Sequence, residues 1–108
     1  MRYVLVCPDD FLHQLLHGTA PAGDAPLYLV ADPGARARIA RSGSQALSGN
    51  LDDPAIYRRA FRSGREAVIV AAPAERLAKI LTALRAVAPQ TPVLALRDEE
   101  ELPSGLPT

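Results

Sequence analysis

The sequence EAVIVAAP at residues 66–73 is the stretch that decides the fold. Its apolar residues do not alternate with polar ones, so a strand made of them has two faces to bury, which is typical of a parallel sheet covered by helices. In residues 74–87 apolar side chains recur at three- and four-residue spacing, and residues 92–97 return to an apolar run. The three segments therefore predict a strand, a helix and a strand in one βαβ unit.

The rest of the chain continues this alternation. Short apolar runs predict three more strands at residues 3–7, 27–31 and 45–47, and amphipathic segments predict three more helices at residues 9–18, 35–42 and 54–62. Five strands and four helices predict an α/β fold, a doubly wound parallel five-stranded sheet that is Rossmann-like, with strand order 3-2-1-4-5.

The ends of these helices carry recognisable signals. Asp53 followed by Pro54 is the preferred combination of an N-cap residue and a proline at the first helical position. Gly18 and Gly43 are the expected stops of the first two helices. In the first helix, the apolar stripe that faces the core is expected to consist of Phe11, Leu12, Leu15 and Leu16.

The amino-acid composition of the chain limits the classes of binding partner that are expected. The 108 residues are enough for one domain, and twelve basic residues balance twelve acidic ones, so net charge does not indicate a nucleic-acid partner. A single cysteine excludes an internal disulfide, and no apolar run is long enough to insert in a membrane, so a cytoplasmic location is expected. We expect residues 1–97 to form the domain and residues 98–108 to be a tail or linker.

Residues 45–73 carry the most specific pattern. Their sequence, QALSGNLDDPAIYRRAFRSGREAVIVAAP, resembles the part of the RCK (regulator of potassium conductance, or TrkA-N) domain in which a Gly-Asp-Ala-Thr-Asp motif precedes a helix and an apolar strand. The resemblance covers residues 3–97 and is strong from Asp32 onward, where the family has an acidic residue after its second strand. The positions that fall on the motif are Gly49, Asn50, Asp53, Pro54 and Ala60, with Phe61 where the family usually has glycine.

The sequence departs from this family at its nucleotide site. The family has Gly-x-Gly-x-x-Gly after its first strand, because glycines let the backbone approach a diphosphate at a helix N-terminus. Here residues 7–12 read CPDDFL, without a glycine. Pro8 removes an amide donor, and the carboxylates of Asp9 and Asp10 repel an anion. Asn50 also replaces the aspartate of the motif, so NAD binding is expected to be weakened or lost.

The resemblance implies a non-catalytic RCK/TrkA-N-like regulatory or assembly module. It would be a homodimer, connected with potassium transport through a membrane transporter or channel, or appended to a larger protein such as one with a fused catalytic domain. No cofactor is expected, or at most a nucleotide, NAD or ATP. The alternatives are a nucleotide-sensing domain for ATP/ADP, NAD(H) or a cyclic dinucleotide, and the N-terminal module of a phosphoesterase; a hydride-transfer enzyme ranks last.

The candidate ligand-binding residues lie after the predicted strands. Asp32 would accept ribose hydroxyls, or would only cap a helix together with Gly34. Gly49 and Asn50 would let the chain pass an adenine, or would form a turn that needs unusual backbone angles. Ala72, after the fourth strand, completes the set.

Two further clusters have alternative interpretations. His13 and His17 are spaced by four residues on the predicted first helix, as in zinc-binding helices, but a solvated face that also includes Asp10 is the commoner arrangement. Cys7 would be a reactive thiol beside a helix N-terminus, or a packed core residue, which the neighbouring carboxylates favour.

Arginines form two possible basic strips, for which solvated helix faces are the favoured interpretation. The strips are Arg36, Arg38 and Arg41, and Arg58, Arg62 and Arg65.

Overall fold

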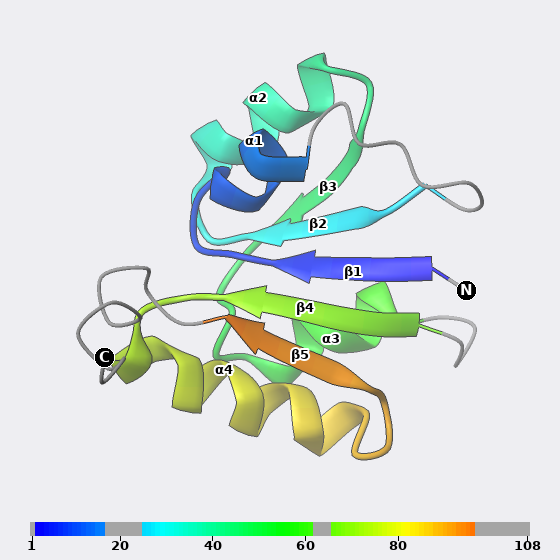
Figure 1. Cartoon of the computed structure of the whole chain (residues 1–108), viewed down its shortest axis with the longest axis vertical. Helices are drawn as coiled ribbons and strands as arrows, with labels where there is room; N and C mark the ends of the chain where they lie inside the picture. Colours follow the sequence, from blue (N-terminus) through cyan, green and yellow to red (C-terminus); the bar gives the residue numbers. More distant parts are fainter. Residues whose placement is uncertain (1, 17–24, 62–65, 97–108) are drawn as a thin grey trace, which may run out of the picture.

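A computed structural model of the chain describes residues 2–16, 25–61 and 66–96. The described residues form a five-stranded sheet with the order β3-β2-β1-β4-β5, in which all neighbouring strands are parallel (Figure 1). The predicted doubly wound, Rossmann-like α/β architecture and its strand order are therefore confirmed.

The strands lie close to the apolar runs of the sequence. They are β1 (Arg2–Val6), β2 (Leu27–Val30), β3 (Gln45–Ser48), β4 (Glu66–Ala71) and β5 (Val93–Leu96). The run that decides the fold becomes β4, which pairs with β1 on one side and with β5 on the other. Val68 and Val70 are buried in the core on the side of α3 and α4, whereas Ala67 and Ile69 on the other face are only partly buried.

Two of the four helices in the described ranges begin at the predicted residues, 54 and 74, whereas the first begins at residue 11 instead of 9 and the second at residue 33 instead of 35. The helices are α1 (Phe11–Leu16), α2 (Pro33–Arg41), α3 (Pro54–Ala60) and α4 (Ala74–Val87). The Asp53 carboxylate accepts a hydrogen bond from the Ala55 amide at 3.0 Å, as an N-cap does, and Gly43 after α2 has a φ of 95°. Gly18 and Arg62, the predicted ends of the first and third helices, lie outside the described residues.

The helices form two layers, one on each face of the sheet. Helices α1 and α2 contribute Leu12, Ala35 and Ile39 to a core cluster with residues of β1 and β2. Helices α3 and α4 contribute to the larger cluster on the opposite face, which includes Tyr57 and Ile80. No helix within the described ranges is long and apolar enough to cross a membrane.

The orientation of α1 differs from the prediction. Phe11 and Leu15 were expected to face the core, but they are 49% and 57% exposed, while Leu12 and His13 are buried. Leu12 lies in the cluster of β1 and β2, and His13 packs edge-on against the Tyr28 ring at a centroid distance of 5.1 Å. Because residues 12 and 13 point toward the sheet, positions 11 and 15 rotate away from it.

Candidate functional site

The carboxyl ends of the five parallel strands lie at one edge of the sheet, where doubly wound folds bind their ligands. The predicted site residues lie in the loops at this edge. Asp32 and Gly34 begin α2, Gly49 and Asn50 follow β3, and Ala72 follows β4.

One of these five residues is not accessible. Ala72 is 7% exposed and belongs to the core cluster that also contains Ile80. Its amide donates a hydrogen bond to the Leu96 carbonyl at 3.4 Å. The candidate site is therefore confined to the half of the edge formed by β1, β2 and β3.

Polar groups of the loop between β1 and α1 form hydrogen bonds within the protein. The Pro8 carbonyl accepts hydrogen bonds from the amides of Ala31 and Asp32, at 3.0 and 3.2 Å. One oxygen of Asp9, Oδ1, accepts from the Phe11 amide at 2.9 Å and from the Cys7 thiol at 3.3 Å. A carboxylate of the protein thus binds an amide at the start of α1, where a dinucleotide fold would offer amides to a phosphate.

The second carboxylate of this loop is held by α2. The Asp10 carboxylate accepts from Arg38 Nε at 3.0 Å and from Gln14 Nε2 at 3.1 Å. The Asp10 side chain is 13% exposed, and the hydrogen bond from Arg38 lowers the pKa of this carboxyl below its ordinary value. Asp10 is therefore ionised at neutral pH and is bound to the nearest cation.

Asp32 has two roles in this arrangement. Its Oδ1 accepts from the Gly34 amide at 3.0 Å, which makes Asp32 the N-cap of α2. Its Oδ2 lies 3.8 Å from Arg38 Nη2, and the side chain is 54% exposed. The capping interpretation is thus confirmed, while the exposed carboxylate still has the position from which a ribose would be bound.

The loop after β3 has an ordinary backbone. Gly43 is the only glycine in the described ranges with a positive φ, so the prediction that Gly49 and Asn50 form a turn with unusual angles was wrong. A Cβ at Gly49 would lie 3.1 Å from Ile56 Cδ1, so a larger residue there requires the Ile56 side chain to shift by a few tenths of an ångström. Asn50 Oδ1 accepts from the Asp52 amide at 2.9 Å, which closes a local turn.

Tyr57, a residue of the core, holds the loop after β3 in place. Tyr57 is fully buried, and its hydroxyl donates to the Leu51 carbonyl at 2.6 Å. Burial, with a further contribution from Asp52, raises the pKa of this phenol well above its ordinary value. Tyr57 therefore acts as a neutral donor that holds the loop of Gly49 and Asn50.

Two potential nucleophiles of the described residues, Cys7 and Ser42, are not activated. Cys7 is buried, and burial raises the pKa of its thiol to about 11, so it is protonated at neutral pH and is a packed core residue, as the sequence favoured. The Ser42 hydroxyl donates to the Ile39 carbonyl at 2.7 Å, and it lies 2.9 Å from His13 Nε2. The Ser42 hydroxyl therefore donates to a backbone carbonyl of α2 and is not positioned as a nucleophile.

Only one of the two histidines that could form a metal site, His13, lies in the described residues. His13 is buried against Tyr28 and Ser42, and His17 lies outside the described residues. No group of three or more metal-binding side chains occurs in the part of the chain that the structure describes.

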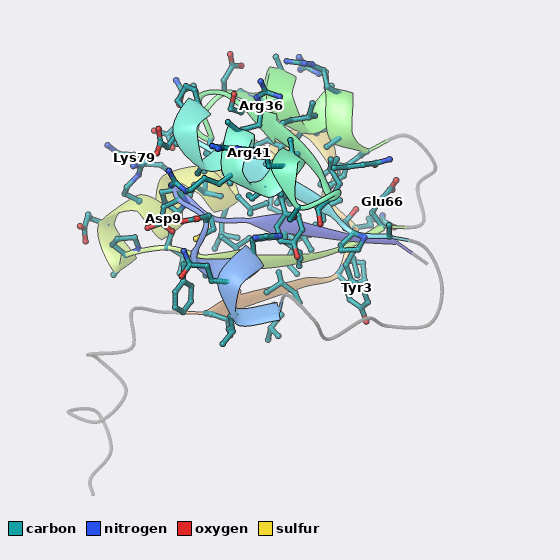
Figure 2. All side chains as sticks on the ribbon, turned by 90° about the horizontal axis from the view of Figure 1, so that it is seen from above. Tyr3, Asp9, Arg36, Arg41, Glu66 and Lys79 are labelled. Atoms are coloured by element: carbon teal, nitrogen blue, oxygen red, sulfur yellow. The ribbon has the colours of Figure 1, made fainter. Side chains whose placement is uncertain are left out.

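The arginine strips are partly engaged in other contacts. Arg36 and Arg41 are labelled on the exposed surface in Figure 2, and Arg41 Nε donates to the Ala37 carbonyl of its own helix at 3.4 Å. Arg38 is bound to Asp10. Arg58 is exposed, whereas Arg62 and Arg65 lie outside the described residues.

The fold and the site define a Rossmann-like α/β chain with an acidic, internally bonded loop at the usual phosphate position. No family model matches the chain, and no curated protein is similar to it at a significant level. The resemblance to the RCK/TrkA-N domain therefore stays a prediction from the residues.

Proposed function

We propose that this chain is a non-catalytic regulatory or assembly module of the RCK/TrkA-N type that has lost ordinary dinucleotide binding. The observation that carries the proposal is the Asp9 carboxylate bound to the Phe11 amide at the start of α1. A diphosphate would have to displace this carboxylate, and α1, with six residues, has few amides and a small dipole to offer in exchange.

Electrostatics supports the same conclusion. Asp9, Asp10 and Asp32 surround the position, and Arg38 contacts two of them. A phosphate charge at about 4 Å from one unpaired carboxylate is repelled by about 4 kcal/mol at an effective dielectric constant near 20, which corresponds to about a thousandfold in affinity. The charge of Arg38, the cation in contact with these carboxylates, is already partly neutralised by Asp10 and Asp32.

Two potential nucleophiles of the described residues, Cys7 and Ser42, are not activated, which agrees with a module without catalysis of its own. The Cys7 thiol is protonated and the Ser42 proton is directed at a carbonyl. The partners that the resemblance implies are a second copy of the chain and a potassium transporter or channel. Attachment to a phosphoesterase is the remaining alternative for its context.

Isothermal calorimetry with NADH and ATP tests the proposal. We expect no saturable heat below about 1 mM ligand, because the repulsion reduces a micromolar site about a thousandfold. The matched variant Asp9→Asn keeps a capping side chain and removes one charge. Micromolar binding of NADH by the unmodified chain would refute the loss of the site.

A nucleotide-sensing domain is the second candidate, and one observation favours it. The outer oxygen of Asp32 is exposed, and its only described ion pair is a 3.8 Å contact with Arg38. A thermal-shift screen with ATP, ADP, NAD(H) and cyclic dinucleotides separates the two candidates, since a ligand that binds the folded state raises Tm. A rise in Tm that the Asp32→Asn variant abolishes would support nucleotide sensing. No rise in Tm with any of these nucleotides would exclude it.

A further inference from the structure

The sheet has one face that the described helices leave partly open. On the side where α1 and α2 lie, β4 and β5 have no helix over them in the described ranges, whereas α3 and α4 cover the opposite face (Figure 1). Tyr3 projects from the sheet on the open side (Figure 2). A shallow groove there is lined by Tyr3, Ala67, Ile69, Pro92 and Leu94. Tyr3 is 41% exposed and Leu94 is 57% exposed, so this apolar surface is continuous with the edge of the sheet.

The edge strand β5 presents free pairing positions beside this groove. The Val68 amide donates to the Pro92 carbonyl and the Ala72 amide to the Leu96 carbonyl, so even-numbered residues of β5 bond to β4. In a parallel ladder the odd-numbered residues then direct their amides and carbonyls outward. These residues are Val93 and Ala95. The strand carries no charge, no proline and no bulge, the devices that usually protect an exposed edge.

We propose that β5 pairs with β5 of a second copy of this chain in an antiparallel, two-fold arrangement centred on Leu94. This inference rests on the assembly role proposed above. The outward groups of Val93 in one copy meet those of Ala95 in the other, so the two five-stranded sheets become one. Leu94 lies opposite its own symmetry mate on the open face, where each leucine covers the other.

The net charge of the chain agrees with this pairing. Twelve basic residues balance twelve acidic ones, so two copies of the chain do not repel each other at long range.

The chain's own tail is a poorer occupant of this face. Its four consecutive acidic residues do not suit an apolar groove, and the prolines at 103 and 107 cannot donate to a strand edge. The surface is also small. Tyr3 and Leu94 together expose roughly 200 Å² in each copy, so with the strand edges the interface falls at the low end of specific contacts. The expected dimer is therefore weak and depends on concentration.

Sedimentation velocity across a concentration series and cysteine cross-linking test the proposal. Residues opposite each other in a non-hydrogen-bonded antiparallel pair have Cα atoms about 4.5 Å apart, which a disulfide can span. We expect Leu94→Cys to form a disulfide dimer under copper phenanthroline. Ala95→Cys should not, because Ala95 lies opposite Val93 of the partner, on the other face. The unmodified chain is the negative control for cross-linking, because its single cysteine, Cys7, is buried.

A charge at the centre of the interface provides the second measurement. Leu94→Asp places two carboxylates against each other and should raise the dimer Kd at least about tenfold. Leu15→Asp is the matched control, because Leu15 is also 57% exposed but lies on α1.

The outcomes separate this interface from the proposed function. A chain that is monomeric at all concentrations, a dimer that survives Leu94→Asp, or equal cross-linking at positions 94 and 95 would each overturn the β5 interface. Calorimetry with NADH is independent of these results. Cross-linking at position 94 in a chain that binds NADH tightly would uphold the interface and refute the proposed function.

Discussion

The Cys7 thiol predicts a measurable pH dependence of stability. Cys7 ends β1 inside the core, and burial raises the pKa of its thiol from an ordinary value of 9.0 to about 11. Replacement by alanine removes the titrating group while it keeps the strand. The Cys7→Ala variant therefore isolates the contribution of this one thiol to the pH profile.

The sign follows from proton binding. Between pH 9 and 11 the unfolded chain has lost the thiol proton and the folded chain still holds it, so the free energy of unfolding falls as pH rises. The contribution is fully present below pH 9 and is lost by about pH 11. From about pH 8.5 to about pH 10 the loss from this group is about 1.2 kcal/mol. Tyr57 also titrates in the unfolded chain near pH 10, but it is present in both proteins and cancels in the difference.

Urea unfolding of both proteins at several pH values is the assay. The difference in the free energy of unfolding between the unmodified chain and Cys7→Ala should shrink by about 1.2 kcal/mol from about pH 8.5 to about pH 10. Val4→Ala, which truncates a fully buried side chain and leaves the thiol in place, should keep the unmodified slope. A constant difference between the unmodified chain and Cys7→Ala would refute the raised pKa and the tight burial of the end of β1.

Three further substitutions test the packing around the candidate site, each by chemical denaturation. Tyr57→Phe leaves the buried Leu51 carbonyl without its donor and should cost about 1 to 3 kcal/mol, so no change would show that water replaces the bond. Gly49→Val should cost about 1 to 3 kcal/mol because its side chain meets Ile56, and an unchanged midpoint would mean that Ile56 moves freely. Asp53→Ala should cost about 1 kcal/mol as a lost N-cap, whereas Asp53→Asn should restore most of it.

Local signals predicted the elements well. Helix α4 occupies the residues 74–87 that its periodicity indicated, and Asp53 and Pro54 begin α3. The strand order followed from the alternation of strands and helices, because short connections and parallel pairing leave few arrangements. These features depend on residues that are neighbours in the sequence.

Local sequence signals could not predict contacts between residues that are far apart in the sequence. His13 is buried because Ser42, 29 positions away, supplies a polar partner, and Asp10 pairs with Arg38 across 28 positions. Neither pairing leaves a periodic signal. The glycine at position 49 was expected for backbone reasons, but the constraint there is steric and comes from the side chain of Ile56, on the following helix.

The position of α1 connects the two proposals. Asp10 binds Arg38 and His13 binds Ser42 at the end of α2, and α1 packs in the layer over β1 and β2. There the Asp9 carboxylate binds the Phe11 amide, on which the proposed loss of dinucleotide binding rests. The same position leaves β4 and β5 without a helix on this face within the described residues. We therefore propose that recognition by this fold takes place at the edge of the sheet and not at its nucleotide crevice.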